Sequence, residues 1–305
     1  MRIACIIDPY ESLHEDHDTS LAILREAQQR GHEVHICEIG DLSVSGGRLF
    51  LQTRELPDNG DEPGSAGQRE SKEFNLIFMR KDPPVDRAFL QATYMLDCSD
   101  VPVWNSPRGL REASEKFFAQ RFPDLIPPTL ITQQRGYLED FLDEMGGTMV
   151  VKPVDGYAGK GVFLVRKDDP NRGAILESAT SEWRYPAMAQ RYLPEIAQGD
   201  KRVLILDGEP IGALNRLPKA SEFRANMAAG GDIEAGTVTE RDRDLVETIA
   251  PALKDFGLHF VGLDVIGGLI TEVNVTSPTC LVEISDFDGV NLAAKVVETW
   301  EKRYA

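Results

Sequence analysis

The order of apolar and polar positions gives the first half of the chain a clear pattern. "RIACIID" is a short apolar run, "DTSLAILREAQQRG" repeats apolar residues at helical spacing, and "HEVHICEI" alternates polar with apolar residues. Asp18 or Thr19 is the expected N-cap of the helix. A strand, a helix and a strand in this order predict a parallel sheet covered by helices.

The next stretch leads to a domain boundary. Residues 57–73 have no apolar pattern and are predicted to form a mobile loop. "FNLIFM" resumes the sheet, and a helix is expected from Leu110 to about Phe122. "PDLIPPT" then indicates the end of this first part.

Beyond this boundary the pattern changes to shorter strands and glycine-rich loops. "GTMVVKPVDGYAGKGVFLVRK" is typical of a strand, a loop and a second strand, and "YPAMAQRYLP" contains another strand. "DKRVLILDGEPIGALNRL" predicts a hairpin that turns at Asp207-Gly208. "LVETIAPALKDFG" predicts a helix.

Charge and cysteine content narrow the classes of function. The 305 residues include 33 Lys and Arg against 50 Asp and Glu, a net charge of -17, so we expect no nucleic-acid or membrane partner. The four cysteines form no CxxC pair, which favours a reducing compartment over a disulfide scaffold or zinc site. The apolar run in "MRIACIIDPY" is too short for a signal peptide, so we expect a cytoplasmic protein.

A glycine-rich loop is the first candidate for phosphate binding. The first strand leads into "DPYES" rather than GxGxxG, and no GxxxxGK[ST] motif occurs. Instead, "KPVDGYAGKGV" places Gly156, Gly159 and Gly161 between two strands, where backbone N–H groups can approach an anion. Taken alone, this loop is equally typical of an ordinary hairpin tip.

Two lysines and a strand exit strengthen the nucleotide hypothesis. Lys152 closes the apolar run "MVVK" beside the glycine loop, although a solvated strand face would also explain it. Lys116 falls on the predicted helix, where Glu112 four residues earlier offers a simple surface ion pair instead. "AQRYLP" leaves a strand at a proline and can present backbone groups to an adenine edge.

"LDVIGGLITEVNVTSPTC" predicts a hairpin with three oxygen ligands. Glu272 and Asn274 are two residues apart and share one strand face. Asp264 joins that face only in the odd register, because a loop of Gly267 and Gly268 alone would turn it away. We therefore predict a loop one residue longer, with Asp264 opposite Glu272 and all three oxygens able to hold Mg²⁺.

Cations are the remaining candidates in this acidic chain. The candidate cations are Arg80, Lys81, Arg202, Arg216 and Arg224. "FRANMAAGG", residues 223–231, carries Arg224 and Asn226 among small residues, a composition that predicts a closing lid. Surface charge is the alternative for each arginine.

Taken together, these segments resemble the prokaryotic glutathione synthetases of the ATP-grasp superfamily. "MRKDPP" and "NVTSPTC" are the specific matches, and the order of the other motifs agrees over nearly the whole chain. The resemblance implies an α/β chain, α+β in its C-terminal part. Its domains are a Rossmann-like N-terminal domain at 1–122, a small lid at 123–191 and a catalytic domain at 192–305.

The resemblance also assigns roles to residues. It implies ATP contacts from the two lysines, the glycine loop and the strand exit: Lys116, Lys152, Gly156, Gly159, Gly161, Gln190, Tyr192, Leu193 and Asp200. It implies metal ligands at Asp264, Glu272 and Asn274. Arg202 and Arg224 would be catalytic, and the substrates would contact Arg80, Asn226, Ser277 and Thr279.

The implied activity is ATP-dependent ligation of γ-glutamylcysteine to glycine through an acylphosphate, with Mg²⁺ or Mn²⁺ as cofactor. The family also implies a homo-oligomer, a dimer or a tetramer. The chain departs from the family pattern at Tyr157, Ala158 and Lys160, at Asp16 and His17, and at Val282. These differences leave two alternatives open: a related carboxylate–amine ligase with another acid or amine, and an inactive nucleotide-binding homologue.

Overall fold

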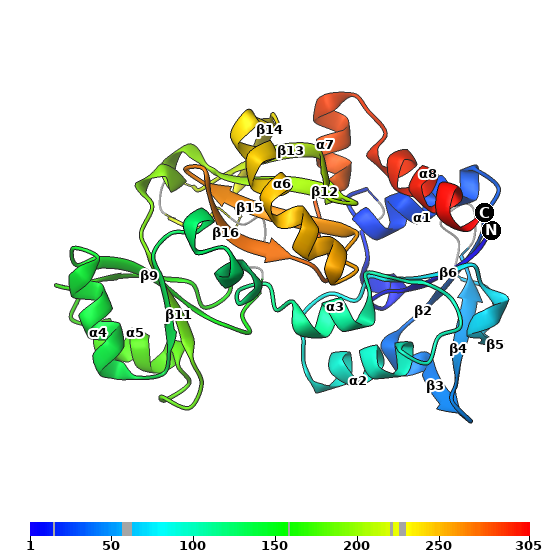
Figure 1. The fold of residues 1–305 in the computed structure, drawn as a ribbon, viewed down its shortest axis with the longest axis horizontal. Helices are drawn as coiled ribbons and strands as arrows, with labels where there is room; N and C mark the ends of the chain where they lie inside the picture. The colour runs from blue at the N-terminus through cyan, green and yellow to red at the C-terminus, as the bar shows by residue number, and fades with distance from the viewer. Residues whose placement is uncertain (15, 57–62, 158, 220–221, 226–229) are drawn as a thin grey trace.

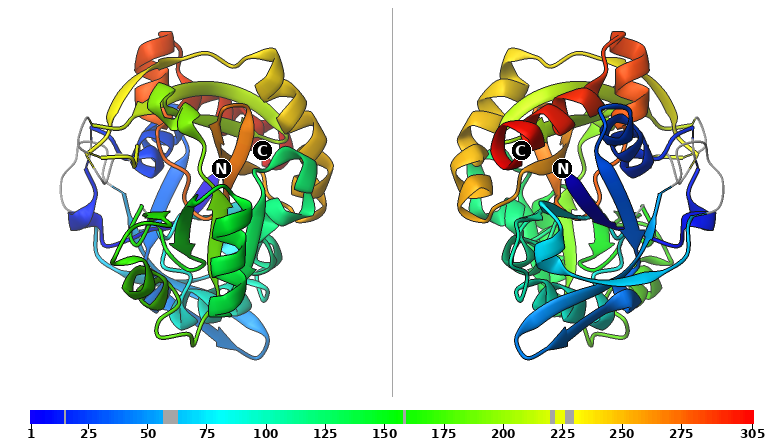
Figure 2. Two further views of the ribbon diagram at one scale, coloured as in Figure 1. Left: turned by 90° about the vertical axis from the view of Figure 1, so that its left-hand side faces the viewer. Right: turned by 90° about the vertical axis from the view of Figure 1, so that its right-hand side faces the viewer.

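The strands in the described part of the chain form three separate sheets. The computed structural model describes residues 1–14, 16–56, 63–157, 159–219, 222–225 and 230–305. Along the long axis, a four-stranded sheet with α4 and α5 occupies one end, and the five-stranded and seven-stranded sheets fill the rest (Figures 1 and 2). The mixture of helices with parallel and antiparallel strands confirms the predicted α/β class.

The seven-stranded sheet contains the predicted parallel core. β1 pairs in parallel with both β2 and β6, and Asp18 caps α1 by accepting a hydrogen bond from the backbone of Leu21 at 2.9 Å. The elements of this part are β1 Arg2–Ile6, α1 Thr19–Gln29, β2 Glu33–Cys37, β3 Leu42–Ser45, β4 Arg48–Glu55, β5 Gly67–Glu70, β6 Leu76–Met79, α2 Arg87–Leu96, β7 Val103–Trp104 and α3 Pro107–Glu112.

The four-stranded sheet is antiparallel, in the order β10-β9-β11-β8. Its elements are β8 Thr129–Thr132, α4 Arg135–Glu144, β9 Thr148–Pro153, β10 Phe163–Arg166, α5 Arg172–Ala179 and β11 Ala187–Arg191. The predicted strand, glycine loop and strand are confirmed: β9 and β10 pair, and the loop between them is described except at residue 158.

The five-stranded sheet is antiparallel as well, in the order β14-β13-β12-β15-β16. Its elements are β12 Asp200–Leu206, β13 Glu209–Leu217, β14 Asp232–Gly236, α6 Glu240–Asp255, β15 Phe260–Ile266, β16 Leu269–Asn274, α7 Leu281–Asp288 and α8 Leu292–Tyr304. Leu206 pairs with Glu209, so the hairpin turns at Asp207 and Gly208 as predicted.

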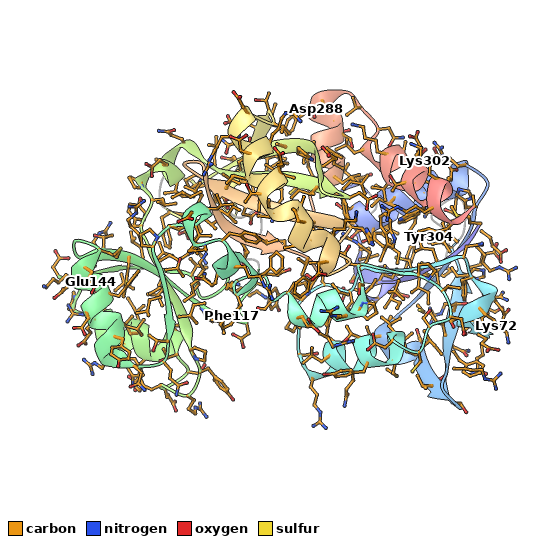
Figure 3. All side chains as sticks on the ribbon, in the orientation of Figure 1. Lys72, Phe117, Glu144, Asp288, Lys302 and Tyr304 are labelled. Carbon is orange, nitrogen blue, oxygen red and sulfur yellow. The ribbon has the colours of Figure 1, made fainter. Side chains whose placement is uncertain are left out.

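The hydrophobic cores separate one sheet from the other two. Two buried clusters each combine side chains of the seven-stranded and five-stranded sheets, for example Ile6 with Val261 and Phe78 with Leu204. The third cluster contains only residues of the four-stranded unit. Figure 3 shows Glu144, at the end of α4, far from Tyr304 of α8 along the long axis. The four-stranded unit therefore has its own core, while the other two sheets share theirs.

Asn105 ties these two sheets together. Its side-chain nitrogen donates to the carbonyls of Phe260 and Val275 at 2.8 and 2.7 Å, and its oxygen accepts from the backbone of His259 and Phe260. All of these bonds are internal, and Asn105 is buried. The end of β7 is thereby fixed to the strands that carry the candidate metal ligands.

Two sequence predictions are wrong in this half of the molecule. The predicted helix from Leu110 to Phe122 stops at Glu112, and a separate 3₁₀ helix covers Phe118–Arg121. Within the loop predicted at 57–73, residues 67–70 form β5, which pairs with β4; residues 57–62 lie outside the described ranges. Cross-strand pairing orders a polar segment that has no apolar pattern of its own.

The end of α3 changes the interpretation of Lys116. The backbone leaves the helical region at Ala113, so Lys116 is not stacked one turn after Glu112. Glu112 pairs with Arg108 at 3.2 Å, whereas Lys116 pairs with Glu272 at 2.9 Å. The surface ion pair that the sequence offered as an alternative therefore does not form. The domain limits at residues 122 and 191 stay a prediction.

Candidate functional site

A pocket lies between the four-stranded and five-stranded sheets, and we call it the intersheet pocket. Most of the predicted site residues line it: Lys116, Lys152, Gly156, Gly159, Gln190, Tyr192, Leu193, Asp200, Arg224, Asp264 and Glu272. Outside its lining are Gly161, Arg202, Asn274, Arg80, Ser277 and Thr279. Asn226 is outside the described residues.

One part of this pocket is apolar and lies beside the predicted adenine-binding strand exit. Val150 of β9, Ile266 of β15 and Ile196 line it together with Leu193. The side chain of Gln190 is buried and donates to the hydroxyl of Thr129 at 3.0 Å, which fixes the end of β11. An apolar slot with backbone polar groups at one edge suits a flat heterocycle.

The hairpin of β15 and β16 has the predicted register. Asp264 pairs with Glu272 and Gly262 with Asn274, so the three oxygen-bearing side chains share one face of the sheet. The predicted longer loop is wrong, because Ile266 pairs with Leu269 across a two-residue turn. The register shifts instead by a bulge at Thr271, between Glu272 and the turn.

The bulge also orients a carbonyl group. The extra residue, Thr271, lines the intersheet pocket, and the Nζ of Lys152 lies 3.5 Å from its carbonyl oxygen. Both turn glycines have positive φ, 57° at Gly267 and 77° at Gly268, as a tight two-residue hairpin turn requires. The turn is thus local, and the bulge sets which side chains face the pocket.

Four buried charges alternate on the neighbouring strands. The carboxylate of Asp264 accepts hydrogen bonds from Nε and Nη2 of Arg202 at 2.6 and 3.2 Å. It also forms an ion pair with Nη2 of Arg216 at 3.0 Å. The same Nη2 of Arg216 donates to Asp200 at 2.6 Å. The register explains the arrangement, because Arg202 pairs with Asp264 across β12 and β15, and Asp200 with Arg216 across β12 and β13. Charge-assisted contacts of this kind fix all four side chains.

The pKa values of the two aspartates in this group shift in opposite directions. Burial opposes ionisation of Asp264, but Arg202 and Arg216 together outweigh it and hold the pKa of Asp264 below its ordinary value. Burial raises the pKa of Asp200 to about 6, because Arg216 compensates only in part and Asp264 adds repulsion. In addition, the buried Oδ1 of Asp200 accepts no hydrogen bond within the described residues.

Two lysines face this group from the other side of the pocket. The Nζ of Lys116 contacts Oε1 of Glu272 at 2.9 Å and donates to the carbonyl of Gly156. Burial lowers the pKa of Lys152, opposed by Glu272 and reinforced by the like charge of Lys116. The two ammonium groups therefore converge on the region of Glu272.

The glycine loop lies close to the segment that was predicted to be a lid. Arg224 donates to the carbonyl of Gly159 at 3.0 Å and pairs with Glu222 at 2.6 Å. Hydrogen bonds from Arg224 hold the pKa of Glu222 at about 2. Phe223, Arg224 and Ala225 line the intersheet pocket.

Of the predicted substrate residues, Arg80, Ser277 and Thr279 lie outside the lining of the intersheet pocket. Arg80 is buried, donates from Nε to Ser20 at 2.9 Å and from Nη2 to the carbonyl of Pro278 at 2.9 Å, and lies between two aromatic rings. It thereby holds the segment that carries Ser277 and Thr279 against the N-terminal sheet. Thr279 is exposed and Ser277 is half-buried.

Sequence reasoning left two charged residues of this site without a role. Arg216 was one of several cations, and only the alignment of β12 with β13 shows that it bridges Asp200 and Asp264. Glu115 was not singled out at all. It is a further carboxyl group near Glu272, and both burial and the charge of Glu272 raise its pKa.

The residues present fit a divalent cation bound together with phosphates. No group of three or more His, Cys, Asp and Glu side chains in the described ranges could hold a metal ion unaided. Asp264 and Glu272 nevertheless present carboxylate oxygens on one face, with an amide oxygen at Asn274 beside them. Such a set resembles the incomplete oxygen shells at which Mg²⁺ retains water or phosphate ligands.

Comparison with known proteins assigns both parts of the chain to one family. The model for the N-terminal domain of prokaryotic glutathione synthetase matches residues 1–111, and the model for its ATP-grasp domain matches residues 115–289. The glutathione synthetase of Synechococcus elongatus is 43% identical over 99% of this chain and 98% of its own length. That of Yersinia pestis is 41% identical over 100% of this chain and 98% of its own length.

Solved structures agree at the level of the fold. The D-cycloserine synthetase DcsG superposes with a TM-score of 0.72 at 15% identity, covering 98% of this chain and 99% of its own. The ATP-grasp ligase PsnB, in a complex with a precursor variant, Mg and ADP, gives a TM-score of 0.62 at 19% identity, covering 98% and 97%. These matches confirm the predicted ATP-grasp fold. No helix in the described residues is long and apolar enough to cross a membrane.

Proposed function

This chain belongs to the prokaryotic glutathione synthetase family, and from that membership we propose that the intersheet pocket binds ATP for the ligation of γ-glutamylcysteine to glycine. The chain is an ATP-dependent ligase, and its products are glutathione, ADP and orthophosphate. The observation that carries the assignment to this pocket is the register of β15 and β16, which brings Asp264 opposite Glu272 while Lys116 and Lys152 face them.

The nucleotide would lie with its base in the apolar slot. The backbone of residues 190–193 would contact the adenine edge, between Val150 and Ile266. Asp200 has an unsatisfied buried oxygen at the pocket wall and would accept a hydrogen bond from a nucleotide hydroxyl. The triphosphate would then extend toward Lys116 and Lys152.

Asp264, Glu272 and Asn274 would hold the divalent cation. When bound, Mg²⁺ neutralises charge on the phosphates and makes the γ-phosphorus a better electrophile. The lysines add to this neutralisation from the opposite side, and their position is fixed before the nucleotide arrives. We propose Mg²⁺ as the physiological ion, with Mn²⁺ as a substitute.

The chemistry activates a carboxylate, because its direct attack by an amine would have to expel oxide. A carboxylate oxygen of γ-glutamylcysteine attacks the γ-phosphorus, the bond to the bridging oxygen breaks, and ADP leaves. The amine of glycine then attacks the acyl carbon, orthophosphate departs, and the nitrogen loses a proton. Arg202 and Arg224 would stabilise charge on the transferred phosphoryl group, and Arg80, Asn226, Ser277 and Thr279 would orient the substrates.

An acylphosphate must be protected from water until glycine reacts. Arg224 reaches the glycine loop across the pocket in the described structure, so these two segments can form a cover over the phosphates. Two glycines of this loop have positive φ, 73° at Gly159 and 71° at Gly161. Residues other than glycine adopt this conformation only with strain.

The direct test is a coupled measurement of ADP and glutathione. We expect ADP release only when ATP, a divalent cation, γ-glutamylcysteine and glycine are all present, with one glutathione per ADP. A panel of other amines and acids distinguishes the alternatives. Faster turnover with a different pair would assign the chain to a related ligase, and nucleotide binding without turnover would indicate an inactive homologue.

The cellular compartment and the oligomeric state of the enzyme are proposed as well. We propose a cytoplasmic enzyme, because none of its four cysteines forms a disulfide among the described residues. A homo-oligomer stays a prediction from the family, and light scattering of the purified protein would test it.

A further inference from the structure

Among the described residues, the hydrogen bonds of Glu115 all join it to the end of one strand. Its carboxylate Oε1 accepts from the hydroxyl of Thr276 at 2.9 Å, from the backbone of Val275 at 3.2 Å and from the backbone of Thr276 at 3.4 Å. Its own carbonyl accepts from the backbone of Val273 at 3.2 Å. These donors belong to β16 and the residues just after it, which form the edge of the five-stranded sheet.

Lys116, the next residue, contacts the same strand through Glu272. Lys116 pairs with Glu272 and lines the intersheet pocket, whereas Glu115 is not part of that lining. Two consecutive residues thus hold Glu272, Val273, Val275 and Thr276. Asn274 lies in the middle of this clamped stretch, and Ser277 follows directly after it.

The surroundings of Glu115 disfavour its negative charge. Glu115 is placed where Glu272 repels it, and burial disfavours its charge as well. An edge strand could satisfy its outward N–H groups with water instead. A carboxylate kept in such a position gives something that water does not, namely a fixed geometry for the end of β16.

We propose that Glu115 is a positioning residue that clamps the end of β16, so that Glu272, Asn274 and the substrate segment 275–279 keep one alignment relative to Lys116. It touches neither nucleotide nor substrate, and its effect passes through the residues that it holds. This inference rests on the proposed function of the intersheet pocket.

Three variants separate positioning from charge and from simple folding. Glu115→Ala removes every side-chain acceptor, and Glu115→Gln keeps an oxygen at the Oε1 position without the charge. Glu112→Ala is the matched control, since Glu112 is an exposed glutamate three residues earlier that pairs only with Arg108 in the described structure. Each variant is measured for Mn²⁺ binding in the presence of ADP by electron paramagnetic resonance, a readout that requires no peptide substrate.

We expect Glu115→Ala to weaken Mn²⁺ binding by about 10-fold to 100-fold, because unpaired donors let the end of β16 move. Glu115→Gln is expected to stay within about threefold of the wild type, and Glu112→Ala to match it. A Gln variant as weak as the Ala variant would overturn the inference, because charge would then be the important property. Unchanged Mn²⁺ binding in a folded Glu115→Ala protein would overturn it as well.

If Glu115→Ala does not fold, Thr276→Val tests the same clamp from the other side. This change removes the shortest contact to Glu115, and we expect about threefold to tenfold weaker Mn²⁺ binding, rescued by Thr276→Ser. Equal binding by the Val variant and the wild type would contradict the clamp. A different result would contradict the proposed function: a wild-type protein that binds Mn²⁺ with ADP but forms no glutathione.

Discussion

The two walls of the intersheet pocket differ in how they hold their polar groups. The five-stranded wall contributes Asp264, which is bonded to Arg202 and Arg216, and these three residues are 2%, 6% and 3% exposed. The four-stranded wall offers Lys152, the glycine loop and the backbone of residues 190–193. The charge of Asp264 is satisfied by Arg202 and Arg216 within the protein, whereas the second wall presents groups that a ligand can complete.

Their cores differ in the same way. The five-stranded sheet shares its core with the N-terminal sheet and is tied to it by Asn105, but the four-stranded unit has a core of its own. A wall with a separate core can tilt as a body without disturbing the packing of the rest. In the proposed function, the fixed wall would hold the metal and the phosphoryl group, and the adaptable wall would bind the nucleotide.

The largest effect is expected from the fixed wall. Asp264→Ala removes a proposed metal ligand and leaves two buried arginines without their shared partner. We expect turnover to fall by at least about 1000-fold and the free energy of unfolding to drop by about 3–5 kcal/mol. Steady-state kinetics and urea unfolding measure the two changes. Asp232→Ala, on the exposed edge strand β14, should alter neither, and an active, stable Asp264→Ala protein would contradict the comparison.

A change on the adaptable wall should affect binding and spare the fold. Lys152→Ala is expected to weaken ATP binding by about 10-fold to 100-fold, because a phosphate loses a charged donor. Stability should stay nearly the same, since burial already lowers the pKa of Lys152 and disfavours its charged form in the folded protein. Calorimetry checks the affinity. Lys167→Ala, whose side chain is 62% exposed, is the control, and equal affinity in both variants would remove Lys152 from the site.

A smaller effect is expected from the backbone of the glycine loop. Gly161 has φ of 71°, and an added Cβ would lie 3.0 Å from Cγ of Pro153. Gly161→Ala should therefore shift the loop and weaken nucleotide binding by about threefold to tenfold. Gly173→Ala, in helix α5 with open space around it, should leave binding unchanged. Equal affinities for the two alanine variants would show that the loop conformation is irrelevant to binding.

The smallest effect concerns the pH dependence of the fixed wall. The folded protein raises the pKa of Asp200 to about 6, so it keeps a proton that the unfolded chain has already released. This contribution to stability is present below the ordinary aspartate pKa and is lost as pH rises toward about 6. Asp200→Asn should remove that part of the slope in urea unfolding of the ligand-free protein. An identical slope for both proteins between pH 4 and 6 would contradict the assignment.

Local sequence patterns determined much of what was found. Periodicity predicted the parallel start of the chain, the two strands around the glycine loop and the turn at Asp207-Gly208. The same pattern placed Glu272 and Asn274 on one face of a strand. These features depend on residues a few positions apart, so their information is contained in short segments of the chain.

Partners from distant segments decided the rest. Alternation gave the face of each side chain in β15 and β16, but a bulge at Thr271 rather than a longer loop set their register. Glu115 leaves the helical pattern to bind Val275 and Thr276, 160 and 161 residues later in the chain. The energies of bulges, buried ion pairs and edge-strand contacts depend on what packs against them, and that information appears only when the sheets have assembled.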